Sequence, residues 1–597
     1  MTFPATFEND VEVGETIPPM TAHAVSVSLP TWRANVGYEE GEEWVISKMK
    51  TGYPRFFIHK AIERLANAIV EKYGHDGERA MLFPSHSIAQ RCLDYFNTQA
   101  PPEDRQQARI LDLVPSAAKE RSEELEIISP RISAFIFPAV SFKIAKAFWQ
   151  HSGDGISSRR AEHCHGLFEK GALVDASTID GMRRLCKGPR RYQRQTSIDL
   201  DTPIDVRNDG NDTQDPNDFV EQRFGRNLDL SLTTNAKLAV RRRIAGSLTA
   251  DVELPEALAL SKDEENTRQV AGFSEDDVYL YPCGMSSIFN AHRNLMATKG
   301  PLQSIVFGFP YIDTLKIVQK FGPGSHFYGF GSSEELDDLE KRLEGGERFL
   351  ALFTEFPSNP LLRSPDIERI RDLADKYDFY VVIDETIGNF MNVNVLPYAD
   401  IVVSSLTKVF SGDSNVMGGS LVLNPRAKSY KQLKQTWNSD YVDNHWAEDS
   451  IFLERNSRDF VSRIERINAN AEAICDVLRA HPRVKQTNYP KYSPTRQYYD
   501  KCRTVRGGYG GLLSATFYSK EEAITFFDNL DTVKGPSLGT NFTLSSPYVI
   551  LAHYGELDWC ASWGVEADLV RFSVGLEDTN KLVDTFRRAL EAIERLA

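Results

Sequence analysis

The chain has 597 residues, of which 41% are apolar and 26% charged, so its composition is that of an ordinary globular protein with room for several domains. Its 69 basic and 84 acidic side chains give a net charge of −15. This balance disfavours generic binding to nucleic acid or to anionic membranes, because both need clustered Lys and Arg. No run of about 18 apolar residues occurs, so we expect no membrane span.

The N-terminus and the cysteines point to a cytoplasmic protein. The first residues contain several acids and lack the basic start and apolar stretch of a secretory or mitochondrial signal. The seven cysteines are an odd number, widely spread and without a C-x-x-C pair, so we expect no disulfide scaffold. His163-Cys164-His165 has no second ligand pair at a plausible spacing, so we expect no metal site.

The N-terminal half divides into an arm, residues 1–74, and a long insertion, residues 75–270. Within the insertion, residues 131–150 (RISAFIFPAVSFKIAKAFWQ) are expected to contribute a strand and a helix. Residues 188–222 are polar and rich in Asp and Asn, which predicts a flexible segment.

Residues 271–450 alternate short apolar runs with helical patterns, which predicts an α/β domain with a mostly parallel sheet covered on both faces. The predicted strands are residues 278–282, 304–309, 349–356, 380–386, 401–407 and 418–424. In such sheets ligands bind beyond the carboxyl ends of the strands. Functional residues are therefore expected directly after each run.

Residues 451–597 predict a smaller α+β domain. Residues 453–480 have the spacing of one long amphipathic helix. Strand patterns and helix patterns follow it: strands over 484–490, 511–519 and 569–575, and helices over 521–530 and 579–596.

The most informative motif is SSLTKVFSGDSNVMGGS, residues 404–420, where a strand ends in hydroxyl residues, a single lysine and a Gly-bearing loop. Lys408 can form an imine with an aldehyde, and the hydroxyls of Ser405 and Thr407 can hold a phosphate. A surface lysine after an edge strand is the competing interpretation.

Two further strand ends favour the first interpretation. Asp384 ends a wholly apolar strand, where a carboxylate is costly unless paired, and a ring N–H⁺ would satisfy it. Gly284 and Met285 open a helix, whose backbone N–H groups attract phosphate. A helix N-cap at Asp384 and a plain strand-to-helix turn at Gly284 remain the alternatives.

These motifs, in this order, resemble the Cys/Met-metabolism family of pyridoxal-phosphate enzymes, together with R-F-S-V-G-L-E-D at residues 571–578. The resemblance covers residues 45–74 and 277–597, and the long insertion and the opening LPTWRANVGYEEGEEW are similar to the fungal cystathionine γ-synthase branch. It implies a fold-type-I transferase with pyridoxal 5'-phosphate as cofactor.

The resemblance also implies roles for individual residues. Lys408 would carry the cofactor and move protons between substrate carbons, and Asp384 would pair with the pyridinium nitrogen. Tyr311 would stack on the ring and help to activate the incoming amine. Asn359, in E-F-P-S-N-P, would hydrogen-bond the phenolic oxygen of the cofactor and lie near the substrate carboxylate.

Arg571 would clamp the substrate α-carboxylate, a task suited to a planar two-pronged donor, with Ser537 also at the substrate. Tyr53 and Arg55 would reach into the active site of the neighbouring subunit and bind the phosphate, which implies a homodimer or a homotetramer with shared sites.

The sequence departs from the family pattern at four places. Y-P-R-F-F-I-H, residues 53–59, lacks the usual N-P-T after the arginine. Glu385 stands where D-N-T is usual, Cys283 stands where Ser is usual, and Pro536 replaces a glutamate that many members carry before S-L-G. The last difference concerns how the thiol acceptor is recognised.

The implied reaction is a γ-replacement that joins an O-acyl-L-homoserine, acetyl being favoured, to L-cysteine and gives L-cystathionine for methionine biosynthesis. The substrates and product are therefore small amino acids. The alternatives are a γ-replacement of secondary metabolism with another nucleophile, a lyase that breaks cystathionine, and a catalytically silent scaffold. A scaffold would have no need for Lys408, Asp384, Tyr311 and Arg571 together.

Overall fold

The computed structural model describes every residue except 1–10, 55, 117–129, 179–231, 260–265 and 597. The chain forms two compact units. The larger unit comprises residues 1–60, 146–159 and 230–597, and the smaller unit comprises residues 61–145 and 160–229.

These bounds differ from the expected single insertion over 75–270, because parts of that stretch belong to the larger unit. Residues 131–150 do form a strand, β3 (Ile132–Pro138), and a helix, α7 (Phe142–Ser152), as expected. The second half of α7 joins the larger unit, where Phe148 makes edge contacts with Phe289 and Phe321 at 6.0 and 5.9 Å. The segment 188–222, predicted to be flexible, lies outside the described residues.

The larger unit is built on a seven-stranded sheet in the order β5-β11-β10-β9-β8-β6-β7. Six of these strands run in the same direction, and β11 runs in the opposite direction. The strands are β5 (Val278–Tyr281), β6 (Ser304–Phe307), β7 (Ser325–Tyr328), β8 (Ala351–Glu355), β9 (Tyr380–Asp384), β10 (Ile401–Ser405) and β11 (Gly419–Leu423). All six expected strands are present, which confirms the α/β class. The sequence missed β7, a half-buried edge strand with little apolar character.

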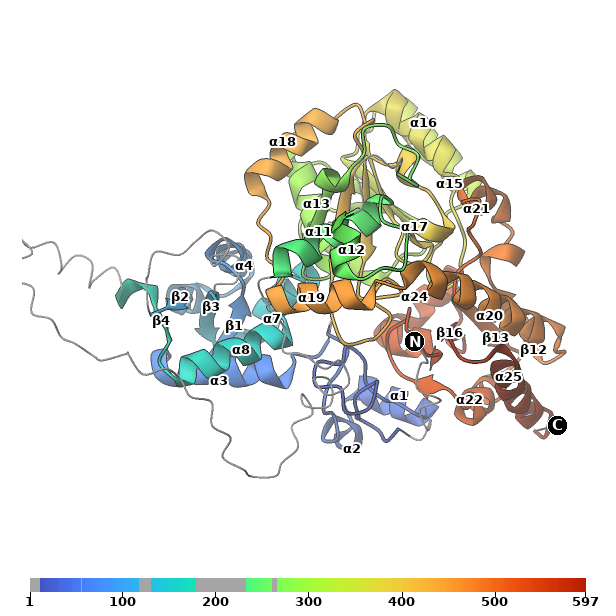
Figure 1. Ribbon diagram of the computed structural model, residues 1–597, viewed down its shortest axis with the longest axis horizontal. Helices are drawn as coiled ribbons and strands as arrows, with labels where there is room; N and C mark the ends of the chain where they lie inside the picture. Colours follow the sequence, from blue (N-terminus) through green and yellow to red (C-terminus); the bar gives the residue numbers. More distant parts are fainter. Residues whose placement is uncertain (1–10, 55, 117–129, 179–231, 260–265, 597) are drawn as a thin grey trace, which may run out of the picture. The chain divides into compact units, whose positions relative to one another are not determined.

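Helices pack on this sheet (Figure 1). Helix α13 (Gly284–Lys299) packs on β5, β10 and β11, and α14 (Ile312–Lys320) packs on β6 and β7. Helix α16 (Ile367–Tyr377) packs on β9 and on α15 (Ser333–Glu344). Helix α18 (Tyr430–Asp440) lies on α13, and α11 (Thr233–Ala245) contacts α12 (Leu254–Ala259) and β5.

The C-terminal part has a five-stranded sheet in the order β12-β13-β16-β15-β14. Its strands are β12 (Val484–Asn488), β13 (Leu512–Phe517), β14 (Val533–Lys534), β15 (Leu544–Ser546) and β16 (Val570–Ser573). Helix α20 (Phe460–Ala480) packs on β12 and β13, and both α20 and α22 (Lys520–Asn529) pack on α25 (Thr579–Glu594) (Figure 1). This part belongs to the same compact unit as the seven-stranded sheet.

The predicted single helix over 453–480 is wrong. The chain forms α19 (Ala447–Asn456) and α20, separated by three residues. The break arises because the backbone N–H of Ser457 closes α19 onto the carbonyls of Leu453 and Glu454, while Asp459 precedes the first turn of α20.

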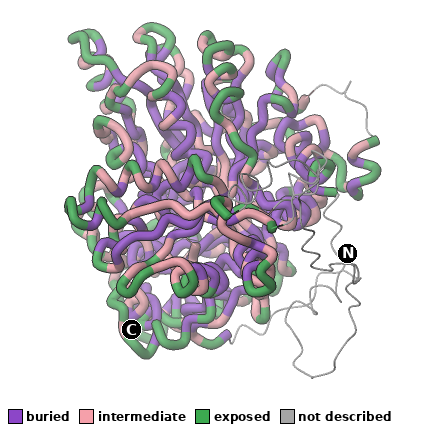
Figure 2. The backbone as a smooth tube through the Cα atoms, turned by 90° about the vertical axis from the view of Figure 1, so that its left-hand side faces the viewer, coloured by how far each residue is buried: buried purple, intermediate pink, exposed green. Residues whose placement is uncertain are grey.

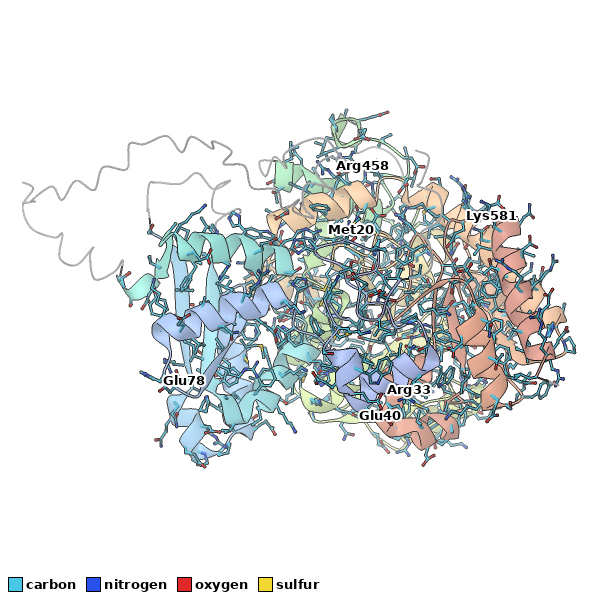
Figure 3. The ribbon with its side chains drawn as sticks, turned by 90° about the horizontal axis from the view of Figure 1, so that it is seen from below. Met20, Arg33, Glu40, Glu78, Arg458 and Lys581 are labelled. Atoms are coloured by element: carbon cyan, nitrogen blue, oxygen red, sulfur yellow. The ribbon has the colours of Figure 1, made fainter. Side chains whose placement is uncertain are left out.

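The remaining described helices of the larger unit are short. The N-terminal arm holds α1 (Trp32–Glu40), which buries Trp32 and exposes Arg33 and Glu40 (Figure 3). The others are α2 (Glu43–Ile46), α17 (Asn389–Asn392), α21 (Arg496–Cys502), α23 (Tyr548–His553) and α24 (Leu557–Ser562).

The smaller unit is a four-stranded antiparallel sheet in the order β1-β3-β2-β4. Besides β3 it contains β1 (Glu78–Phe83), β2 (Arg109–Pro115), β4 (Leu173–Asp175), α4 (His86–Gln99), α5 (Pro102–Gln107), α8 (Ser158–Glu169) and most of α3 (Lys60–Tyr73). In its core Phe96, Phe135 and Phe137 pack together, with ring centroids 5.1 to 5.8 Å apart.

Burial follows this layering: buried residues run through the interior of the molecule, while exposed residues gather at loops and outer helix faces (Figure 2). Among the described residues, no helix combines the length and apolarity needed to cross a membrane.

Arg463 of α20 fastens the loop that follows β10. Its buried guanidinium donates to the carbonyl oxygens of Val409 and Phe410 at 2.9 and 2.8 Å. It also donates to the Asn456 carbonyl at 2.8 Å and to Asn541 Oδ1 at 2.9 Å. Charge-assisted hydrogen bonds of this kind are the strong ones, so one side chain fixes both the loop and the turn between α19 and α20.

We therefore expect Arg463→Met to lower the free energy of unfolding by about 3 kcal/mol or more, because it leaves several buried carbonyl groups without donors. Thermal unfolding of the variant and of Arg463→Lys, which keeps the cation, measures this. A loss below about 1 kcal/mol for Arg463→Met would show that the carbonyls find other donors.

Candidate active site

Lys408 lies in the turn that follows β10, at the carboxyl end of the strand, and its side chain is buried. Its Nζ donates to Tyr53 Oη at 3.0 Å and to Ser537 Oγ at 2.9 Å. Gly539 allows this approach: it has φ +69°, and a Cβ there would stand 2.8 Å from Lys408 Cβ. Three residues predicted from distant parts of the sequence therefore meet at one amine.

Tyr53 reaches Lys408 within one chain. The expectation that Tyr53 enters a neighbouring subunit stays a prediction. The arm follows its own C-terminal region on the way: the Val25 N–H donates to the Ser414 carbonyl, the Leu29 N–H donates to the Lys534 carbonyl, both at 2.9 Å, and Ser26 Oγ donates to the Pro536 carbonyl. Arg55, the other predicted arm residue, lies outside the described residues.

Ser537 also connects Lys408 to Arg571. Arg571 is 4% exposed; it donates to the Ser537 carbonyl at 2.6 Å and to Asn359 Oδ1 at 3.2 Å, and its guanidinium lies 4.4 Å from the Tyr548 ring centroid. Its Nε is buried without a hydrogen-bond partner, and burial lowers the pKa of the group. Ser537 has φ 114°, a costly conformation for a residue with a side chain.

Glu355, at the end of β8, holds the backbone of two predicted site residues. Its carboxylate accepts the backbone N–H of Tyr311 and, at 3.1 Å, that of Asn359. Burial, and then the charge of Asp384, raise its pKa to about 8. No role was expected for Glu355, although it shows the same signal in the sequence as Asp384: a carboxylate at the end of an apolar run.

Asp384 ends β9, between Glu355 of β8 and Val403 of β10 in the register of the sheet. Its Oδ1 accepts the Thr386 N–H at 2.8 Å, and Thr386 Oγ1 accepts the Ser405 N–H at 2.8 Å. Burial raises the pKa of Asp384, so its charged form needs a cationic partner.

The start of α13 lies beside the end of β10. A Cβ at Gly284 would stand 2.6 Å from Ser405 Cβ, so only glycine allows the helix to begin here. Tyr311 Oη lies 3.7 Å from Met285 Sδ, which brings the predicted ring-stacking tyrosine to the same helix start. The Thr407 hydroxyl instead bonds the backbone of Gly418, accepting at 3.1 Å and donating at 3.3 Å.

These residues fit pyridoxal 5'-phosphate. A buried amine at Lys408 suits its aldehyde, and a carboxylate of raised pKa at Asp384 suits its ring N–H⁺. The first turn of α13, cleared by Gly284, offers backbone N–H groups for its phosphate. The buried, unpartnered Nε of Arg571 suits a substrate carboxylate. Cofactor and substrate could therefore bind side by side.

The raised pKa of Glu355 predicts a pH dependence of stability in cofactor-free protein. The folded state keeps a proton on Glu355 that the unfolded state releases above the ordinary pKa of 4.5. The contribution of Glu355 to the free energy of unfolding is therefore complete below pH 4.5. It is lost as the pH rises through about 8. We expect the Tm of the wild type, relative to that of Glu355→Gln, to fall between pH 5 and pH 9. A pH-independent difference would contradict the assignment.

Comparisons with known proteins identify the family. A profile described as Cys/Met metabolism PLP-dependent enzyme matches residues 267–591, more than half of the chain, and one described as fungal trans-sulfuration enzyme, N-terminal domain, matches residues 61–157. The chain is 52% identical to a cystathionine gamma-synthase of Neurospora crassa, over 98% of each chain.

Two further relatives span the full length. The chain is 42% identical to the cystathionine gamma-synthase-like enzyme iboG2 of Amanita muscaria, over 98% of this chain and 97% of the relative. It is 39% identical to a cystathionine gamma-synthase of Saccharomyces cerevisiae, over 97% and 98%. With these matches and this site, the chain belongs to the Cys/Met metabolism family of PLP-dependent enzymes.

Proposed function

We propose that the enzyme joins an O-acyl-L-homoserine, with acetyl as the favoured acyl group, to L-cysteine to give L-cystathionine for methionine biosynthesis in the cytoplasm. The names of the relatives from Neurospora crassa and Saccharomyces cerevisiae support this reaction. The observation that carries it is the link from Lys408 through Ser537 to Arg571. It places an amine that can transfer protons near a guanidinium that can bind the substrate carboxylate.

Bound pyridoxal 5'-phosphate supplies an aldehyde that condenses with the substrate amine and a ring that withdraws electrons. Asp384 would hold the ring nitrogen protonated, and Tyr311 would stack on the ring. Gly284, Met285 and Ser405 would bind the phosphate through the start of α13, and Thr407 would act indirectly by fixing Gly418.

Lys408 Nζ is the group that moves protons. Held by Tyr53 Oη and Ser537 Oγ, it can take a proton from Cα of the substrate and later act at Cβ, where loss of a proton accompanies departure of the γ-acyloxy group. Arg571 and Asn359 would hold the α-carboxylate, so that both carbons stay within reach of this one amine.

Incubation of the holoenzyme with O-acetyl-L-homoserine and L-cysteine tests the reaction, with products identified by mass spectrometry. We expect cystathionine as the main product and its loss in Lys408→Ala. Release of 2-oxobutyrate instead would indicate a lyase. A product with another nucleophile from a wider panel would indicate a γ-replacement of secondary metabolism. A colourless wild-type protein that makes no product would favour a scaffold.

We further propose a homodimer or homotetramer in which each chain completes its own site with Tyr53. The family resemblance favours the oligomer, and the contact between Tyr53 and Lys408 within one chain favours sites that are not shared through this residue.

Mixed oligomers of Lys408→Ala and Tyr53→Phe chains, co-expressed with two tags and purified through both, test this arrangement. We expect Tyr53→Phe alone to lose at least tenfold in kcat, and the mixed oligomer to gain nothing over it, because neither chain then holds both groups. If Tyr53 acted on the partner, one site of each mixed pair would be intact and roughly half of the wild-type activity would return.

A further inference from the structure

Glu385, the departure from the family pattern beside Asp384, is fully buried and makes an ion pair with Arg268. Arg268 Nη1 donates to Oε1 at 3.1 Å and Nη2 donates to Oε2 at 2.9 Å, and the two side chains are 0% and 1% exposed. This two-pronged geometry is the strong form of the contact.

The backbone at Glu385 ties the pair to the cofactor site. The Glu385 N–H donates to the Val403 carbonyl at 3.0 Å, which continues the pairing of β9 with β10, and its own carbonyl accepts the Asn389 N–H at 2.7 Å. Glu385 directly follows Asp384, the last residue of β9, so the two carboxylates are neighbours along the chain.

Arg268 arrives from a segment outside the sheet and is itself held from several sides. It donates to the Ile244 carbonyl at the end of α11 at 3.3 Å, its carbonyl accepts from Asn394 Nδ2 at 2.6 Å, and its guanidinium lies 5.5 Å from the Phe390 ring centroid. Removing such a cation would leave an unpaired carboxylate buried directly beside Asp384.

We propose that Arg268 is a positioning residue for the cofactor: by neutralising Glu385 it leaves Asp384 as the one unpaired carboxylate at the end of β9 that can meet the pyridine nitrogen. Without Arg268, Asp384 and Glu385 compete for a single proton, and a protonated Asp384 no longer pairs with the ring. Burial and the charge of Asp384 raise the pKa of Glu385 against the effect of Arg268, which agrees with this competition. The proposal rests on the family's cofactor and not on the choice of substrates.

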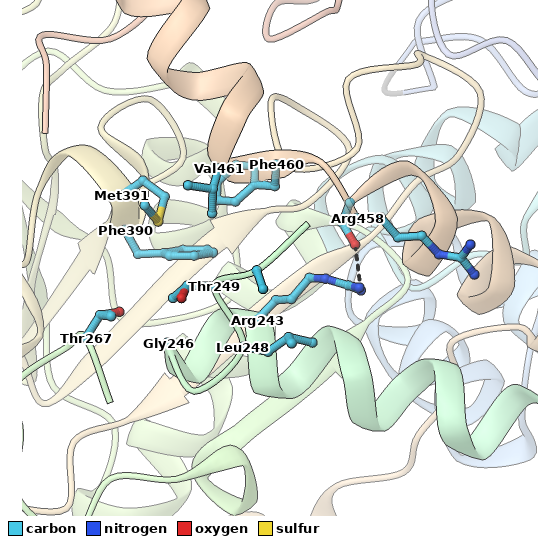
Figure 4. A pocket seen from close by; sticks show the side chains of 12 residues that line it. Arg243, Gly246, Leu248, Thr249, Thr267, Phe390, Met391, Arg458, Phe460 and Val461 are labelled. Carbon is cyan, nitrogen blue, oxygen red and sulfur yellow. Dashed lines mark hydrogen bonds between the residues drawn. The ribbon is translucent and has the colours of Figure 1, made fainter. Parts of the chain in front are cut away.

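The same region offers a matched control. Arg243 of α11 makes a buried ion pair with Glu454, whose Oε1 lies 3.1 Å from Nη2 of Arg243. Figure 4 shows Arg243 and Thr267, the neighbour of Arg268, toward opposite ends of the pocket that both line. The Arg243 pair thus shares the neighbourhood and the burial. Its carboxylate, however, belongs to α19, also accepts from Arg458 Nη2 at 2.8 Å and does not adjoin Asp384.

The test measures binding of pyridoxal 5'-phosphate to cofactor-free protein by fluorescence, together with the pH titration of the bound cofactor's absorbance. We expect Arg268→Met to raise the Kd at least tenfold. The double variant Arg268→Met/Glu385→Met, which removes both charges, should return to within about threefold of the wild type. Arg243→Met should stay within twofold, whatever its Tm.

An unchanged Kd in Arg268→Met, or a double variant as weak as the single one, would overturn the proposal, since Arg268 would then act through packing alone. If Arg268→Met does not fold, Glu385→Gln replaces it. In Glu385→Gln, the Arg268 guanidinium has lost its carboxylate partner. The pKa of the bound cofactor, followed by its absorbance, should then shift by about one pH unit, and an unchanged pKa would overturn the proposal. None of these measurements uses a substrate, so they stand apart from a failure of the proposed reaction.

Discussion

The site depends on three distant segments meeting at Ser537. Its hydroxyl accepts from Lys408 Nζ, its carbonyl accepts from Arg571, and the preceding residue, Pro536, accepts from Ser26 of the arm. The residue has a backbone conformation that side chains disfavour, with φ 114°. Such strain persists only where surrounding contacts fix it, and here Lys408, Arg571 and the arm provide these contacts.

The sheet supplies the other constraint. Asp384 and Glu355 end adjacent parallel strands, and Ser405 ends the next, so their backbones emerge at one edge. Two buried carboxylates at neighbouring strand ends raise each other's cost of ionisation. The structure gives them different hydrogen bonds: Glu355 accepts two backbone N–H groups and fixes Tyr311 and Asn359, while Asp384 accepts the Thr386 N–H.

Much of this arrangement is visible in the sequence, because strand ends and parallel pairing bring polar residues to one edge. The apolar runs identified six of the seven strands of the large sheet, and the motif order identified Lys408, Asp384 and Arg571. The misses have local causes. Strand β7 carries Ser and His and is only half buried, and the break between α19 and α20 depends on hydrogen bonds at Ser457 that leave the amphipathic pattern undisturbed. Arg268 and Arg463 contact residues that lie far away in the sequence. Such contacts leave no regular spacing of residues from which they could be predicted.

The buried arginines show how charge is distributed around the site. Arg463 is satisfied by protein carbonyls and by the Asp459 carboxylate, and Arg268 is paired with the Glu385 carboxylate. Arg571 is as deeply buried, yet among the described residues it makes no salt bridge. A buried cation is costly unless a charge compensates it, and a tyrosine ring and two oxygens compensate only in part. A substrate carboxylate is the anion that we propose for Arg571, and its binding would return part of the cost of burying this cation as affinity.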